Sequence, residues 1–71
     1  MIKATFVEPA GDNESKVFVK LFADTKDEVE TTPLDDIKGF PKGKYIEMGS
    51  SCITASLDIG FMKSDGTWQW S

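Results

Sequence analysis

The chain has 71 residues, with 12 acidic and 8 basic side chains and a formal net charge of −4. All of the basic residues are lysine, and an acidic chain without a basic cluster lacks the charge that binds phosphate backbones, so we expect no nucleic-acid partner. It has no histidine and one cysteine, Cys52, which excludes an internal disulfide and the common zinc sites. We therefore expect no metal and no cofactor.

A chain of this length predicts a single small domain over residues 1–71, and the strand and turn patterns described below predict that it is β-rich. At this size one hydrophobic core supplies a net stability of only about 3–5 kcal/mol, and such domains gain further stability from a disulfide, a metal or a partner. Since this chain has neither a disulfide nor a common zinc site, its size predicts oligomerisation or docking on a larger protein. No apolar stretch has the length of a secretory leader or a membrane span, so we expect no membrane association.

Two β-type segments come first, at residues 2–7 and 16–23, and the Pro, Gly and Asn of residues 8–15 predict a loop between them. We expect these segments to pair as antiparallel strands. In the second segment, apolar residues occupy both alternating sets of positions, with Val17, Val19, Leu21 and Ala23 on one face and Phe18 and Phe22, beside Lys20, on the other. This pattern predicts that one face meets something beyond the first core layer, either a helix or another subunit.

One or two short helical turns are expected between residues 25 and 39. Thr25 followed by Glu28 matches a capping box, in which both side chains accept hydrogen bonds from backbone groups at the start of a helix. Pro33 at a first helical position and Gly39 just after a last one repeat the same pattern.

Strand signals return at Tyr45, break at residues 49–51 and resume at residues 52–56, where we expect Ile53 and Ala55 to share one face of a half-buried strand. A turn near residues 57–58, a strand over 59–63 and the Asp65-Gly66 turn then complete a three-stranded C-terminal meander. The predicted fold is mainly β, a small sandwich or open barrel of two N-terminal strands, the short helical turns and the meander.

The C-terminal hairpin contains the candidate partner-binding residues. A two-residue turn at Asp65-Gly66 pairs Phe61 with Trp70 and Lys63 with Trp68, which places Ile59, Phe61, Trp68 and Trp70 on one face. These rings either fill the core or leave one tryptophan, Trp70 at the end of the hairpin, as an exposed anchor for a partner. We take Phe61, Trp68 and Trp70 as the candidate site.

Catalytic residues are not expected. The acidic residues between positions 24 and 36 lack the spacing of a calcium loop, and a solvated acidic surface is the interpretation we favour. Cys52 and the neighbouring serines have no histidine to activate them, so Cys52 is expected to be a small buried apolar group. We expect the protein not to be an enzyme.

Four segments occur in a fixed order: ADTKDEV (residues 23–29), IKGFPKG (37–43), MGSSC (48–52) and KSDGTW (63–68). In this order they resemble a family of small proteins that are encoded among the structural genes of tailed bacteriophages and prophages. The resemblance covers about two thirds of the chain and implies a virion-associated or head-and-tail-region structural protein, with no catalytic residues to carry over.

Two functions follow as expectations. The first is a non-enzymatic phage structural or assembly protein that contacts copies of itself, as a homo-oligomer, or other phage structural proteins, in the virion or in the host bacterial cytoplasm. The alternative is a small inhibitory or regulatory protein of a mobile element that binds a host protein.

Overall fold

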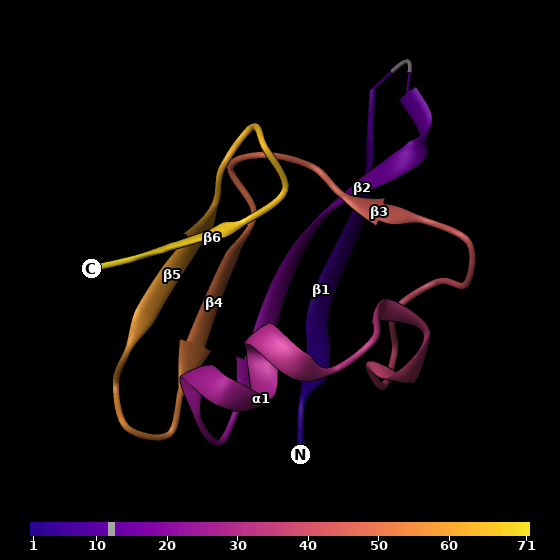
Figure 1. Cartoon of the computed structure of the whole chain (residues 1–71). Helices are drawn as coiled ribbons and strands as arrows, with labels where there is room; N and C mark the ends of the chain where they lie inside the picture. Colours follow the sequence, from indigo (N-terminus) through magenta and orange to yellow (C-terminus); the bar gives the residue numbers. More distant parts are fainter. Residues whose placement is uncertain (12) are drawn as a thin grey trace.

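The computed structural model describes residues 1–11 and 13–71, with Asn13 and Glu14 described by their backbone only. The fold is mainly β, as the sequence predicts, and the described residues form six strands in one mixed sheet, one short helix and one 3-10 turn (Figure 1). The strands are β1 (Lys3–Ala10), β2 (Asn13–Ala23), β3 (Tyr45–Ile46), β4 (Ser51–Thr54), β5 (Ile59–Met62) and β6 (Trp68–Trp70). The helix α1 spans Lys26–Thr31 and the turn η1 spans Leu34–Asp36.

In the described part of the chain, the strands form one sheet and not the two packed sheets of a sandwich, in the order β1-β2-β4-β5-β6, with β3 also paired to β2. Both β3 and β4 run parallel to β2, while β1 is antiparallel to β2 and the last three strands form an antiparallel meander. A parallel neighbour requires a crossover connection, and the segment that contains α1 and η1 supplies it. The predicted N-terminal pair and C-terminal meander are both confirmed.

The N-terminal hairpin is longer than the sequence predicts. We expected a loop over residues 8–15, but β1 continues to Ala10 and β2 begins at Asn13, with Asp12 outside the described residues. Pro9 is compatible with β1 because β1 is an edge strand, where a missing backbone N–H breaks no pairing on the outer side. The register shifts between Ala4 and Phe6, which makes Thr5 the extra residue of a β-bulge.

The predicted helical turns are present and short. The Thr25 side chain accepts a hydrogen bond from the Glu28 N–H at 3.2 Å, while Glu28 Oε1 accepts from the Asp24 N–H at 2.9 Å, one residue earlier than a standard capping box. The N-terminal ammonium of Met1 forms an ion pair with Asp24. Within the described part of the chain, no helix has the length and apolar character needed to cross a bilayer.

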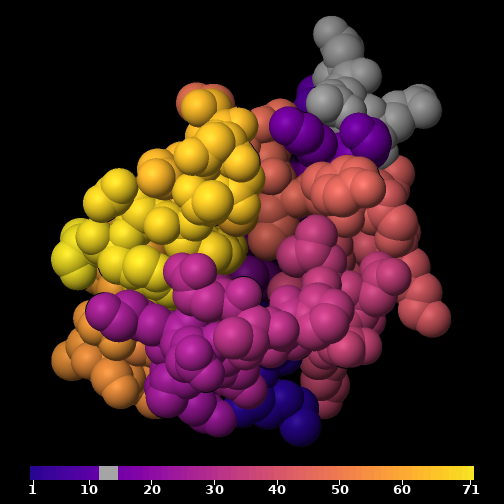
Figure 2. Space-filling view, viewed as in Figure 1, coloured from indigo at the N-terminus to yellow at the C-terminus, as the bar shows by residue number. Residues whose placement is uncertain are grey.

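The core lies between one face of the sheet and the segment of residues 24–40. Val19, Leu21 and Ala23 of β2 are at most 2% exposed, and they belong to one buried cluster with Val29 of α1. In the space-filling view, the magenta and pink atoms of this segment cover the lower middle of the near side, next to the yellow atoms of the C-terminal hairpin (Figure 2). β4 is half-buried, as predicted, but its inward residues are Cys52 and Thr54, and Ile53 lies on the exposed face. The Thr54 hydroxyl is paired with Asp58, which makes burial of this polar residue tolerable.

Candidate functional site: an open apolar sheet face

The two faces of the sheet differ sharply in how they are covered. Residues of β2 that alternate with the buried set point to the opposite face, and this face remains open to solvent. Phe18 is 39% exposed, and the neighbouring strands add Phe6 at 44%, Ile53 and Ile59 at 41% and Phe61 at 49%. We call this surface the open face, with the apolar residues Phe6, Phe18, Phe22, Ile53, Ile59 and Phe61.

Strand register makes these residues neighbours. Phe22 of β2 pairs with Ile53 of β4, which pairs with Ile59 of β5, so three apolar side chains form one row across the sheet. The next row contains Phe6, Lys20, Ser51 and Phe61. The Lys20 ammonium lies 5.6 Å from the centre of the Phe6 ring, at a distance typical of a cation–π contact.

The open face has the size of an interaction site. Taking ~200 Å² for each side chain, the five more exposed of these residues leave roughly 400 Å² of apolar surface in water. On soluble monomers the largest apolar patch is of the order of 300–600 Å² and is often functional. Here it spans four strands of a 71-residue chain.

Charge is distributed unequally between the two sides of the sheet. Residues 24–36, which cover the core, contain six acidic side chains and one lysine. Five of these acids are exposed and Glu28 is half-buried, in agreement with the predicted solvated acidic surface. The open face has the register neighbours Lys3, Lys20 and Glu8 instead, so it is close to neutral. An acidic partner would be repelled by the acidic layer but could bind the open face.

The C-terminal hairpin has a different register from the predicted one. The Lys63 N–H donates to the Thr67 carbonyl at 2.8 Å, so the loop contains three residues, with Gly66 at φ +86°. Phe61 therefore pairs with Gln69, and Trp68 and Trp70 pair with Met62 and Gly60. Our prediction that Phe61 and the tryptophans share a face was wrong, because a shift of one residue reverses the face of every side chain.

Trp70 packs against α1 on the covered side. Its indole Nε1 donates a 2.7 Å hydrogen bond to Glu30, and the Lys26 ammonium lies 5.9 Å from its ring centre. A Cβ added to Gly60 would come within 2.9 Å of the Trp70 ring, so the ring occupies the space that a side chain at position 60 would need. Both Trp68 and Trp70 are half-buried and pack against the core cluster. Of the three predicted site residues, only Phe61 lies on the open face.

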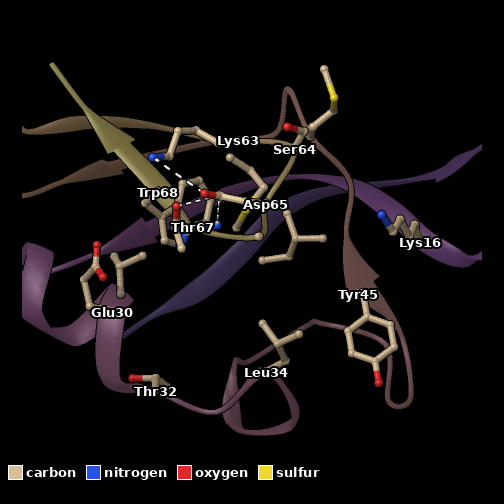
Figure 3. A pocket seen from close by; sticks show the side chains of 15 residues that line it. Lys16, Glu30, Thr32, Leu34, Tyr45, Lys63, Ser64, Asp65, Thr67 and Trp68 are labelled. Atoms are coloured by element: carbon tan, nitrogen blue, oxygen red, sulfur yellow. Dashed lines mark hydrogen bonds and ion pairs between the residues drawn. The ribbon is translucent and has the colours of Figure 1, made fainter.

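A cavity of about 540 Å³ opens on the covered side, between the C-terminal hairpin, α1 and the β3 segment (Figure 3). Its lining includes Leu34, Ile46, Met48 and Trp68, with Glu30 and Lys63 among its charged residues. Asp65, in the hairpin loop, accepts hydrogen bonds from the hydroxyl and the N–H of Thr67, and these bonds hold the pKa of its carboxyl below the ordinary value. Asp65 therefore stabilises the loop.

Among the described residues, no group of three or more His, Cys, Asp or Glu side chains is placed to hold a metal ion. Cys52, the one thiol of the chain, is 3% exposed and belongs to the core cluster, as predicted. Burial raises the pKa of this thiol from 9.0 to about 11, so the thiol is neutral at pH 8. A neutral buried thiol has the character of a packing group.

We expect Cys52 to react with a thiol reagent such as DTNB at pH 8 only as fast as the chain unfolds. A control in 8 M urea should react at the rate of a free thiol. Because the folded pKa is the higher one, the neutral thiol contributes stability below about pH 9, and this contribution is lost as the pH rises through about 11. Rapid labelling of the native protein, independent of urea, would contradict the buried position.

The fold and its surface define a small mixed-sheet domain that is covered on one face by a short helical segment and open on the other. Comparison with known proteins found no matching family model, no similar curated protein and no similar solved structure. The alternation in β2 was the sequence signal for this surface, whereas the contributions of β1, β4 and β5 depended on a register that the sequence did not determine.

Proposed function

We propose that this protein is a non-enzymatic assembly protein that acts by binding another protein surface through its open face. The observation that carries the proposal is the row of half-exposed apolar side chains on the face opposite the helix. A sheet that is apolar on both faces is normally an inner layer with a covering layer on each side. A protein partner supplies the second covering layer.

The setting we propose is the assembly of a tailed phage or prophage particle, in the virion or in the host bacterial cytoplasm. The support is the resemblance of the segments ADTKDEV, IKGFPKG, MGSSC and KSDGTW to small proteins of phage structural gene regions. A small domain with an exposed apolar docking surface suits such a role, because it is stabilised further when the surface is covered.

The test is a complementation experiment in the phage or lysogen that encodes the chain. Deletion of the gene should reduce the yield of complete particles, and wild-type protein should restore it. The variant Phe61→Lys should fail to restore it, because a lysine in the open face opposes burial. The matched control is Met48→Lys, which replaces a residue of similar exposure, 55% against 49%, that lines the cavity on the covered side.

Normal particle yield without the gene, or equal complementation by both variants, would contradict the proposal. Failure of Met48→Lys alone would move the functional surface to the cavity. Circular dichroism of each variant should match the wild type, since both residues are about half-exposed and the substitutions leave the core intact.

The acidic layer favours a second function, that of a small inhibitory or regulatory protein that binds a basic surface on a host protein. Its carboxylates lie in residues 24–36, on the side opposite the open face. Reversing Asp27 and Asp36 to lysine should abolish host-protein binding under this second proposal and leave particle assembly unchanged under the first.

A further inference from the structure

We propose that the occupant of the open face is a second copy of this chain, stacked sheet against sheet about a two-fold axis that runs parallel to the strands between β2 and β4. This inference rests on the proposed function and names its partner. The resulting dimer has two sheets inside and the two helical segments outside.

The charge distribution favours this face over the others for association of two copies. The covering segment of residues 24–36 carries six acids and one lysine, so two copies that met there would repel one another. The open face has Lys3, Lys20 and Glu8 at its register positions, which gives two facing copies little repulsion.

The register makes the open face complementary to itself under this symmetry. A two-fold axis between β2 and β4 places β1 over β5 of the second copy and β2 over its β4, and it keeps each row opposite the same row. Phe22 then faces Ile53, and Phe6 faces Phe61. Lys20 faces the small side chain of Ser51, which leaves room for its long stem. In these two rows the rings and Ile53 meet apolar partners, and Lys20 meets a small side chain. Lys3, at the edge of the sheet, faces Ile59, where its aliphatic stem contacts the apolar side chain and its ammonium reaches solvent.

A two-fold axis perpendicular to the strands is less suitable. It reverses the order of the rows along the strands, so that the central row, which contains Lys20, faces the same row of the second copy. Lys20 would lie against Lys20 of the second copy. With the axis parallel to the strands, the two copies pack as aligned sheets, whose strands cross at about −30° and which lie about 10 Å apart. The two-fold closure also leaves no open face for further growth.

The exposed apolar area agrees with a dimer interface. A standard interface buries about 800 Å² on each partner, of which about 56–58% is apolar. Such an interface therefore buries about 450 Å² of apolar surface on each partner. The open face exposes roughly 400 Å², at ~200 Å² per side chain, which is close to this value. The register neighbours Lys20, Ser51 and Gln69 supply polar surface between the rings.

The test uses sedimentation velocity over a range of concentrations with two complementary variants, Phe6→Lys and Phe61→Glu. The wild type should be a dimer. Each variant alone should be a monomer, with a dissociation constant raised about a hundredfold or more, because each dimer would bury two charges without partners. Within one chain these positions are three strand spacings apart, about 14 Å, which is too far for direct pairing.

An equimolar mixture of the two variants should recover a dimer. In the mixed dimer, the lysine introduced at position 6 of one chain faces the glutamate introduced at position 61 of the other. The first chain keeps Phe61 and the second keeps Phe6, and these two rings still face each other. Met48→Lys is the control and should dimerise like the wild type. A wild type that stays monomeric to high concentration would overturn the second copy as occupant, while the complementation experiment still tests docking on a different protein. A dimer that survives both single variants, or a mixture that stays monomeric, would overturn the proposed face and symmetry.

Discussion

Replacing Trp70 with alanine is expected to lower the free energy of unfolding by about 3 kcal/mol, which is most of the stability of a domain of this size. The ring packs against the core cluster and over Gly60, and its Nε1 donates to Glu30. Loss of the ring leaves a cavity and removes the contacts that join β6 to α1. The measurement is urea unfolding followed by far-ultraviolet circular dichroism.

The control is Trp70→Phe, which keeps an aromatic ring but loses the hydrogen bond to Glu30, at an expected cost of about 1 kcal/mol. Association of the folded fraction should be unchanged in both variants, because Trp70 lies on the covered side. The opposite pattern, normal stability with lost association, would return Trp70 to the role of an exposed anchor.

Leu21→Ala is expected to destabilise the fold by about 2–5 kcal/mol, because Leu21 is 2% exposed at the centre of the sheet. Since the whole domain is worth only about 3–5 kcal/mol, the variant should be largely unfolded near room temperature. The thermal transition measured by circular dichroism should be broad or absent.

A matched control is Ile53→Ala, on the neighbouring strand but on the open face and 41% exposed. Measured on the monomer at low concentration, this variant should lose less than about 1 kcal/mol, because a half-exposed side chain loses less buried surface. Equal destabilisation by the two variants would mean that the open face is covered within the monomer, and it would remove the basis for the proposed function.

The elements that depend on local sequence could be predicted. Alternation in residues 16–23 identified β2 and its two apolar faces, and Thr25 with Glu28 identified the start of α1. These patterns act within a few residues, so a single sequence contains them. The parallel pairing of β2 with β4 joins residues about thirty positions apart, and no local pattern specifies it.

The composition of the candidate site depends on the pairing of β5 with β6, which differs by one residue between the predicted and the observed hairpin. Asp65-Gly66 is compatible with a two-residue turn and with a three-residue loop, and the structure has the longer loop, with Asp65 accepting from Thr67 and Gly66 at positive φ. The longer loop moves Trp68 and Trp70 to the covered face and leaves Phe61 on the open one. The sequence pattern identifies these aromatic residues, but the face of the sheet on which each one lies depends on the strand pairing.

The most direct measurement of the central claim is hydroxyl-radical footprinting of the isolated chain and of the assembled protein. One mass spectrum of the oxidised peptides reports on both faces, because Phe6, Phe18 and Phe61 lie on the open face and the two tryptophans lie on the covered one. On assembly, the oxidation rates of Phe6, Phe18 and Phe61 should fall severalfold, while those of Trp68 and Trp70 stay unchanged. Protection of the tryptophans with unchanged phenylalanines would contradict the account.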